Sequence, residues 1–233
     1  MPPEPATIRI PGLRAIILDL DDTLYPEQAF AFSGFTAVST WLRTQIDCPF
    51  DPAERMRTLF LAGEHRHIFD CLLTTLRHPN PQALLPEMIR RYRTHIPHID
   101  LHPDARAAID RWRGHFRLGL ISDGTLAMQQ AKVDALGLND LLDEIILTGQ
   151  WEEGYGKPHP RAFELMENRL GLHGPELVYV ADNCGKDFVA PNARGWRTVW
   201  MRRPGSVYCD IPPAPGGQPQ FQVQFFPQLD LSR

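Results

Sequence analysis

The chain has 233 residues, of which 43% are hydrophobic and 22% are charged, as in ordinary water-soluble globular proteins. No apolar run reaches the roughly 18 to 20 residues of a membrane span, and the start MPPEPATIRIPG lacks the basic and apolar regions of a secretory signal. We therefore expect no membrane partner, and the formal net charge of -4 argues against a nucleic-acid partner.

Cysteine and lysine usage bears on the compartment and on the site. The four cysteines form no CxxC pair: Cys48, Cys71, Cys184 and Cys209. We therefore expect reduced thiols in a cytoplasmic protein. The basic residues are 21 arginines and only three lysines: Lys132, Lys157 and Lys186. A lysine retained in such a chain draws attention, because its compact ammonium differs chemically from the planar arginine fork.

The first predicted strand, RAIILDL at 14–20, is followed by more acid than a buried strand end should carry. Asp19, Asp21 and Asp22 all lie at this end. We expect Asp22 to cap the turn, the usual role of a single aspartate in such a place. Asp19 and Asp21 are two residues apart, so an extended backbone would present both carboxylates on one side.

A long insertion separates this strand from the next, far longer than a simple crossover requires. Residues 27–98 show no alternating strand pattern. A helix is expected to begin at Asp51, followed by Pro52 at its first position, and another at Asn80, with Pro86 starting a second turn. We predict a small helical bundle at 27–98, inserted into a domain made of 1–26 and 99–233.

Four further apolar runs are expected to be strands: FRLGLIS (116–122), EIILTG (144–149), ELVYVAD (176–182) and WRTVWM (196–201). Their nearly continuous hydrophobicity indicates a parallel sheet that helices cover on both faces. Three intervening segments fit crossover helices that end at glycines: 126–137, 159–171 and 187–195. This alternation predicts a doubly wound α/β fold. Residues 202–220 read as a Pro/Gly-rich loop, and FQVQFF after it as an edge strand.

Polar residues gather where the predicted strands end, which is where open α/β sheets bind ligands. Beyond Asp19 and Asp21, the residues at these ends are Ser122, Asp123, Gly124, Lys157, Asp182 and Asp187. A lone aspartate or serine in such a place is often a helix cap or a turn residue instead. The joint pattern, at matching ends of separate strands, is much harder to produce by capping.

Four of the carboxylates at these ends are candidate metal ligands: Asp19, Asp21, Asp182 and Asp187. Carboxylates crowded at one site repel one another and would become protonated unless a cation compensates them. A hard divalent ion with oxygen ligands resolves that conflict, Mg²⁺ above all. The sequence therefore predicts a magnesium site with a reactive carboxylate beside it.

The motifs DLDDT, SDG, the isolated Lys157 and ADNCGKD, in this order, resemble the four motifs of the haloacid dehalogenase (HAD) superfamily over most of the chain. The resemblance implies a Rossmann-like core, and the helical insertion looks like the family's C1-type cap. Two departures are visible: Asp123 stands where an Asn is frequent, and Ala181 replaces a common Gly. Neither removes a catalytic group.

The resemblance also implies roles. Asp19 resembles the nucleophile and Asp21 the general acid/base. Ser122 and Lys157 resemble the phosphoryl-binding pair. Asp182 and Asp187 match the residues that lie at the magnesium.

These residue types fit a Mg²⁺-dependent phosphatase that hydrolyses a small phosphate monoester through an aspartyl-phosphate. Asp21 could protonate the leaving oxygen and later activate water, and backbone N–H groups around Asp123 and Gly124 could bind phosphoryl oxygens. The substrate class would be a sugar phosphate, a nucleotide or another organic phosphate. Its leaving group would be contacted from the insertion, where Phe30, Phe32 and Arg43 are the candidates.

Several alternatives remain at this stage. Dehalogenases generally lack an acid at the place of Asp21, but a phosphomutase acting on a sugar phosphate keeps it. A catalytically idle phosphate-binding or scaffold protein on the same fold is a further alternative. The run DLDDTLYP is also similar to that of pyrimidine nucleotidases, whose fourth motif generally differs from DNCGKD. A P-loop NTPase is disfavoured because GYGKPHP lacks GxxxxGK[ST], and a zinc site because the histidines have no partners at ligand spacing.

Overall fold

The computed structural model describes residues 7–231, and its chain divides into two compact units. The core unit contains the residues up to Glu27 and from Asp100 onward, and the helical unit contains Gln28–Ile99. The chain passes from the first to the second within helix α1 (Glu27–Gln45). That the segment 27–98 is a domain with its own function stays a prediction.

A single parallel sheet forms the centre of the core unit, as the α/β prediction required. Its strands lie in the order β4 (Glu144–Leu147), β3 (Arg117–Ser122), β2 (Ala15–Leu18), β5 (Leu177–Ala181), β6 (Arg197–Met201) and β7 (Phe221–Val223). The predicted edge strand is β7. Two short strands, β1 (Ile8–Arg9) and β8 (Leu229–Asp230), pair with each other in a separate two-stranded parallel sheet.

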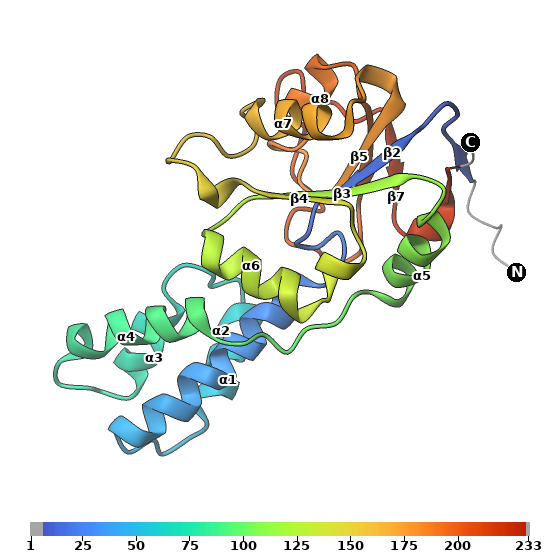
Figure 1. Cartoon of the computed structure of the whole chain (residues 1–233). Coiled ribbons are helices and arrows are strands. Elements are labelled where there is room, and N and C mark those ends of the chain that lie inside the picture. Colours follow the sequence, from blue (N-terminus) through green and yellow to red (C-terminus); the bar gives the residue numbers. More distant parts are fainter. Residues whose placement is uncertain (1–6, 232–233) are drawn as a thin grey trace, which may run out of the picture. The chain divides into compact units, whose positions relative to one another are not determined.

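Helices cover both faces of this sheet, so the winding is double (Figure 1). On one face lie α7 (Arg161–Leu170) and α8 (Val189–Ala193), and on the other α5 (Pro103–Trp112) and α6 (Leu126–Ala135). Single 3₁₀ turns are found at Leu138–Asp140, Thr148–Gln150, Gly174–Glu176 and Phe226–Gln228. Helix α7 ends at Gly171, whose φ of 64° is one that glycine adopts without strain.

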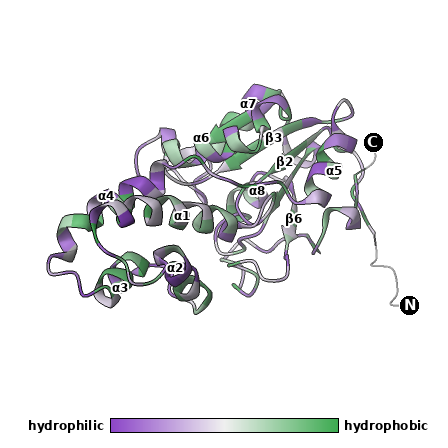
Figure 2. Cartoon of the chain, turned by 90° about the horizontal axis from the view of Figure 1, so that it is seen from below, coloured by the Kyte–Doolittle hydropathy of each residue, from purple (hydrophilic) through white to green (hydrophobic). Residues whose placement is uncertain are grey.

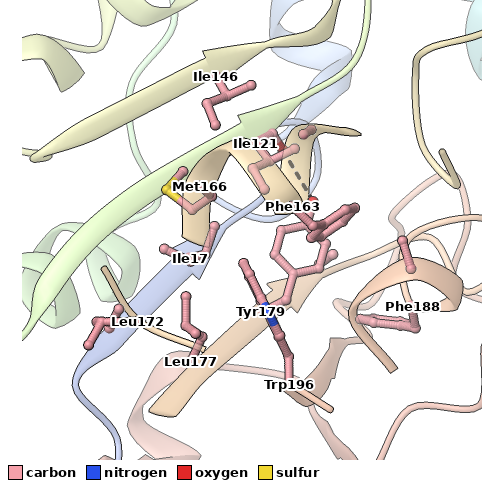
Figure 3. Close-up of a cluster of buried hydrophobic side chains, with 14 of the residues drawn as sticks. Ile17, Ile121, Ile146, Phe163, Met166, Leu172, Leu177, Tyr179, Phe188 and Trp196 are labelled. Carbon is pink, nitrogen blue, oxygen red and sulfur yellow. Dashed lines mark hydrogen bonds between the residues drawn. The ribbon is translucent and has the colours of Figure 1, made fainter. Parts of the chain in front are cut away.

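The apolar runs of the sequence form strands whose side chains are buried in the hydrophobic core between the sheet and helix α7. Figure 3 shows Phe163 and Met166 of α7 facing Ile17 of β2 and Ile121 of β3. Tyr179 of β5 is fully buried in the same cluster, and its hydroxyl donates to the Ile121 carbonyl oxygen at 3.2 Å. The alternate strand residues are buried on the opposite face, so both faces of the sheet exclude water.

The register of the sheet brings three strand ends together. Leu18 of β2 lies opposite Leu120 of β3 on one side and Val180 of β5 on the other. All three strands are parallel, so the residues that follow them leave the sheet at the same edge. The connections after β2, β3 and β5 therefore meet at one place.

The helical unit packs around its own core. Its helices are most of α1, α2 (Pro52–Leu61), α3 (Ile68–Thr75) and α4 (Pro81–Thr94). Buried α1 residues recur at helical spacing, at Ala31, Phe35, Val38 and Leu42. Figure 2 shows these helices with both hydrophilic and hydrophobic stretches.

The sequence predicted the start of α2 correctly but not the course of α4. Asp51 caps α2, and its side chain accepts from the Ala53 backbone N–H at 2.9 Å. Pro86, expected to start a second turn, lies inside the continuous helix α4. The helix therefore runs through the proline, which removes one backbone donor near its first turns without ending it.

Residues 202–220 contain no helix or strand after Met201, in agreement with the loop prediction. Within residues 7–231, no helix combines the length and the apolar character needed to cross a membrane.

Candidate active site

A cavity of about 260 Å³ opens at the carboxyl edge of the sheet, where β2, β3 and β5 end. The predicted site residues that line it are Asp19, Asp21, Ser122, Asp123, Gly124, Lys157 and Asp182. Asp187, the remaining one, is fully buried beside them. The structure thus brings all the sequence-predicted site residues to one place.

A larger hollow of about 1190 Å³ lies at the amino edge of the same strands. Three of its four arginines are paired with carboxylates: Arg14 with Glu176 at 3.0 Å, Arg117 with Asp143 at 3.4 Å, and Arg169 with Glu144 at 3.0 Å. Because no cluster of three potential metal ligands lies there among the described residues, we place the candidate site in the smaller cavity.

Three buried carboxylates lie together here, Asp19 and Asp182 in the cavity wall and Asp187 buried beside them. Oxygen atoms of Asp19, Asp182 and Asp187 lie within 4.8 Å of one another, and this is the only group of potential metal ligands among residues 7–231. Burial, opposed by Lys157, raises the pKa of Asp19 to about 6. Burial and the charges of Asp19 and Asp187 raise the pKa of Asp182 well above its usual range.

The donor set suits a hard divalent cation. All three groups offer oxygen, and Asp182 Oδ2 is buried without a hydrogen-bond partner among the described residues. An orphaned buried carboxylate oxygen is costly unless something outside the chain binds it. The residues present therefore fit Mg²⁺.

Lys157 places a buried ammonium against this cluster. Its side chain is 1% exposed, and its Nζ lies 2.7 Å from Asp19 Oδ1 and 2.8 Å from Asp187 Oδ1. It also donates to the Tyr179 hydroxyl at 2.9 Å. Burial alone would lower the pKa of Lys157, but Asp187 and Asp19 outweigh it and raise that pKa well above the usual value. The ammonium therefore stays charged.

The end of β3 supplies a compact loop. Asp123 joins it to two other loops: its carboxylate accepts from Thr148 Oγ1 at 2.8 Å and from Lys186 Nζ at 2.8 Å. It also accepts from the Lys157 backbone N–H at 3.1 Å. Gly124 has a φ of 136°, a conformation that a side chain rarely permits.

Asp21 lies in a different environment from the other acids. Lys132 Nζ lies 2.7 Å from its Oδ1, Gln129 Nε2 donates to its Oδ2 at 2.9 Å, and the Tyr25 hydroxyl also donates to it. Burial favours the neutral acid, but Lys132 and the hydrogen bonds outweigh burial and hold the pKa of Asp21 below its usual value. Asp21 is not part of the cluster formed by Asp19, Asp182 and Asp187. That Asp21 is a metal ligand therefore stays a prediction.

Asp22 has the structural role expected for it. Its φ is 52°, and its carboxylate accepts from the backbone N–H groups of Glu27 at 2.8 Å and Val207 at 2.7 Å. It thus caps the start of α1 and holds the 202–220 loop. The same loop contributes Tyr208 to the cavity wall.

Sequence reasoning missed several residues that line the cavity, Glu27, Gln129, Lys132, Lys186 and Tyr208, and also Tyr25, which donates to Asp21. For two of them a signal existed. The chain has three lysines, and Lys132, Lys157 and Lys186 all line this cavity. Their scarcity pointed to them, although nothing local indicated which acids they would meet.

The proposed leaving-group contacts lie in the helical unit. Phe30 is buried there, 5.7 Å from the Tyr92 ring and 4.7 Å from the His95 ring. Phe32 packs edge-on against Phe60 at 5.7 Å. Arg43 Nη2 lies 3.5 Å from Asp51 Oδ1. Their contact with a substrate stays a prediction.

A family model described as haloacid dehalogenase-like hydrolase matches residues 13–190. A glyceraldehyde 3-phosphate phosphatase of Methanopyrus kandleri is 28% identical, covering 86% of this chain and 88% of its own length. The human N-acylneuraminate-9-phosphatase is 24% identical, covering 87% and 88%.

A solved structure has the same fold. The HAD-hydrolase YfnB from Bacillus subtilis, bound to magnesium, superposes with a TM-score of 0.67 at 19% identity. The match covers 93% of this chain and 96% of that one.

Proposed function

This chain belongs to the haloacid dehalogenase-like hydrolase family, and we propose that it is a Mg²⁺-dependent phosphatase that works through an aspartyl-phosphate. One observation carries the proposal: three buried carboxylates lie together beside a buried ammonium, and one of their oxygens has no partner in the described chain. Such an arrangement is costly to fold unless a cation and an anionic substrate complete it.

In the proposed reaction, an oxygen of Asp19 attacks the phosphorus of a monoester as the ester P–O bond breaks. Asp21, ionised in the resting site, first takes up a proton from solvent and then gives it to the departing oxygen. Water then attacks the aspartyl-phosphate while Asp21 takes one of its protons, which releases inorganic phosphate and restores Asp19. Mg²⁺ held by Asp19, Asp182 and Asp187 would neutralise charge on the phosphoryl oxygens.

Other residues of the cavity would bind and orient the phosphoryl group. The Ser122 hydroxyl lies at the end of β3, and the backbone around Asp123 and Gly124 follows it. The Lys157 ammonium, held between Asp19 and Asp187, would offset the negative charge that the substrate brings.

Small phosphorylated metabolites are the proposed substrates. The names of the relatives support this: glyceraldehyde 3-phosphate phosphatase, N-acylneuraminate-9-phosphatase and, in Thermus thermophilus, phosphoserine phosphatase at 34% identity over 54% of this chain. We also propose a cytoplasmic location, which the four free cysteines support.

The test is hydrolysis of an aryl phosphate and of a panel of sugar, amino-acid and nucleotide phosphates. We expect turnover with Mg²⁺, none with EDTA, and none for Asp19→Asn. Asp110→Asn, on the exposed face of α5 beside Arg106, is the matched control and should retain activity. Undiminished hydrolysis in excess chelator, or by Asp19→Asn, would overturn the proposal.

A further inference from the structure

The carboxylate of Asp21 is held by donors that the proposed reaction does not use. Lys132 Nζ lies 2.7 Å from Oδ1, where the Tyr25 hydroxyl also donates. Gln129 Nε2 donates to Oδ2 at 2.9 Å. Lys132 and Gln129 both belong to α6 and lie three residues apart, on one face of the helix. Both oxygens of Asp21 are therefore directed by one helix.

Burial makes a purely structural role for Lys132 a poor explanation. Its side chain is 3% exposed although it carries an ammonium. Replacing a buried ion pair by well-packed apolar residues is often neutral or stabilising, so packing alone does not require a lysine here. The contact with the Lys132 ammonium does, however, fix the orientation of the Asp21 carboxylate.

Gln129 joins two parts of the site. It is fully buried, and its Nε2 also lies 2.7 Å from Ser122 Oγ. The carboxylate of Asp21 determines which way the amide points, because only the nitrogen can donate to it. Its Oε1 has no hydrogen-bond partner in the described part of the chain. The hydrogen bonds that hold the Gln129 amide are therefore those donated by its Nε2.

We propose that Lys132 and Gln129 are positioning residues that hold the Asp21 carboxyl group at the leaving-group oxygen and in register with Ser122. The inference builds on the proposed phosphatase function. As the bond from Asp19 to phosphorus forms and the ester P–O bond breaks, a proton that Asp21 has taken up from solvent passes to the leaving oxygen. Lys132 and Gln129 gain and lose no atoms in this step.

The consequence depends on the leaving group. An alkoxide departs slowly unless it is protonated, whereas p-nitrophenolate departs without help. A displaced Asp21 therefore costs rate on an alkyl phosphate and little on p-nitrophenyl phosphate. The ratio kcat/KM reports only the steps up to the first irreversible one, so the later hydrolysis of the aspartyl-phosphate does not enter it.

The experiment compares kcat/KM for glycerol phosphate and p-nitrophenyl phosphate, with Mg²⁺, in Lys132→Met, Gln129→Leu and Asp21→Asn. We expect each variant to lose on the order of 100-fold on the alkyl ester and only a few-fold on the aryl ester. Lys132→Arg, which keeps the charge, should recover part of the alkyl activity. Gln130→Leu, the exposed neighbour on α6, is the control and should match the wild type on both esters.

Thermal melts establish that each variant is folded. Gln129→Asn keeps the amide but shortens its reach, and it replaces Gln129→Leu if that variant does not fold. Equal losses on the two esters in the Lys132 and Gln129 variants, beside a selective loss in Asp21→Asn, would overturn this inference and leave the phosphatase intact. A wild type that hydrolyses neither ester would overturn both.

Discussion

The three acids of the candidate metal centre oppose folding when no cation is bound. Burial and mutual repulsion raise the pKa of Asp19 to about 6 and that of Asp182 well above 3.8. A carboxyl group whose pKa is raised in the folded state stabilises the fold at pH values below its unfolded pKa. That contribution is lost as the pH rises through the folded pKa. Ionising Asp19 and Asp182 in the folded protein at neutral pH therefore costs free energy, which a bound cation offsets.

Removing one of these charges should therefore stabilise the metal-free protein. We expect Asp182→Asn to raise Tm in EDTA at pH 7.5 by about 2–4 °C, the shift for roughly 1 kcal/mol in a chain of this size. The gain should shrink towards pH 4.5, where the wild-type acids take up protons. Thermal melts across this range, with Asp110→Asn as the control, provide the measurement. A gain of the same size at both pH values would contradict the electrostatic explanation.

At the scale of elements, the loop after β3 is held by its contact with the turn after β4. A Cβ added to Gly149 would lie 2.1 Å from the Gly124 carbonyl oxygen and 2.6 Å from the Leu126 backbone nitrogen. Both neighbours are backbone atoms, which cannot move aside as a flexible side chain can. The turn thus sets where the proposed phosphate-binding loop lies.

Gly149→Ala should displace that loop. We expect a loss of about 1–3 kcal/mol in the free energy of unfolding, the usual cost of overpacking, together with a raised KM for every phosphate ester. Gly137→Ala is the control: its φ is 64° and no atom lies within 4 Å of the added Cβ. It should lose about 1 kcal/mol through backbone strain without a change in KM. Denaturant unfolding and steady-state kinetics measure both quantities, and an unchanged KM in Gly149→Ala would refute the displacement.

At the scale of the whole molecule, the helical unit is where we expect substrate preference to reside. Its chain leaves the core unit through α1, which begins a few residues beyond Asp21 and Asp22. In the proposal, residues of this unit contact the leaving group and exclude water during the reaction.

Substitutions in this unit should therefore change the ranking of substrates. We expect Phe32→Leu and Arg43→Ala to alter relative kcat/KM across a panel of phosphate esters, with less than about a three-fold effect on a small generic ester. Phe30 is unsuitable, because it is buried in the unit's own core. Arg117→Ala, at the amino edge of the sheet, is the control. A uniform loss on all substrates would make the helical unit a lid or a stability element.

Two kinds of information could be read from the chain itself. Continuous apolar runs predicted β2 to β6 because a strand buried on both faces has no polar side to display. The aspartates after these runs, together with Ser122 and Lys157, marked the edge where ligands bind, because parallel strands place their carboxyl ends side by side. Each apolar run, and each polar residue that follows it, can be recognised from residues within a few positions of one another. The functional roles assigned to these residues remain predictions for the experiments above.

Tertiary structure alone decided which side chains meet. Asp21 and Lys132 are 111 positions apart, and Asp19 and Lys157 are 138 apart, so no local pattern could pair them. The strand order places β3, and with it α6, beside β2, so that Lys132 and Gln129 of α6 reach Asp21. Burial, pKa and hydrogen-bond partners follow from that packing, because they depend on neighbours in space rather than on neighbours in the chain.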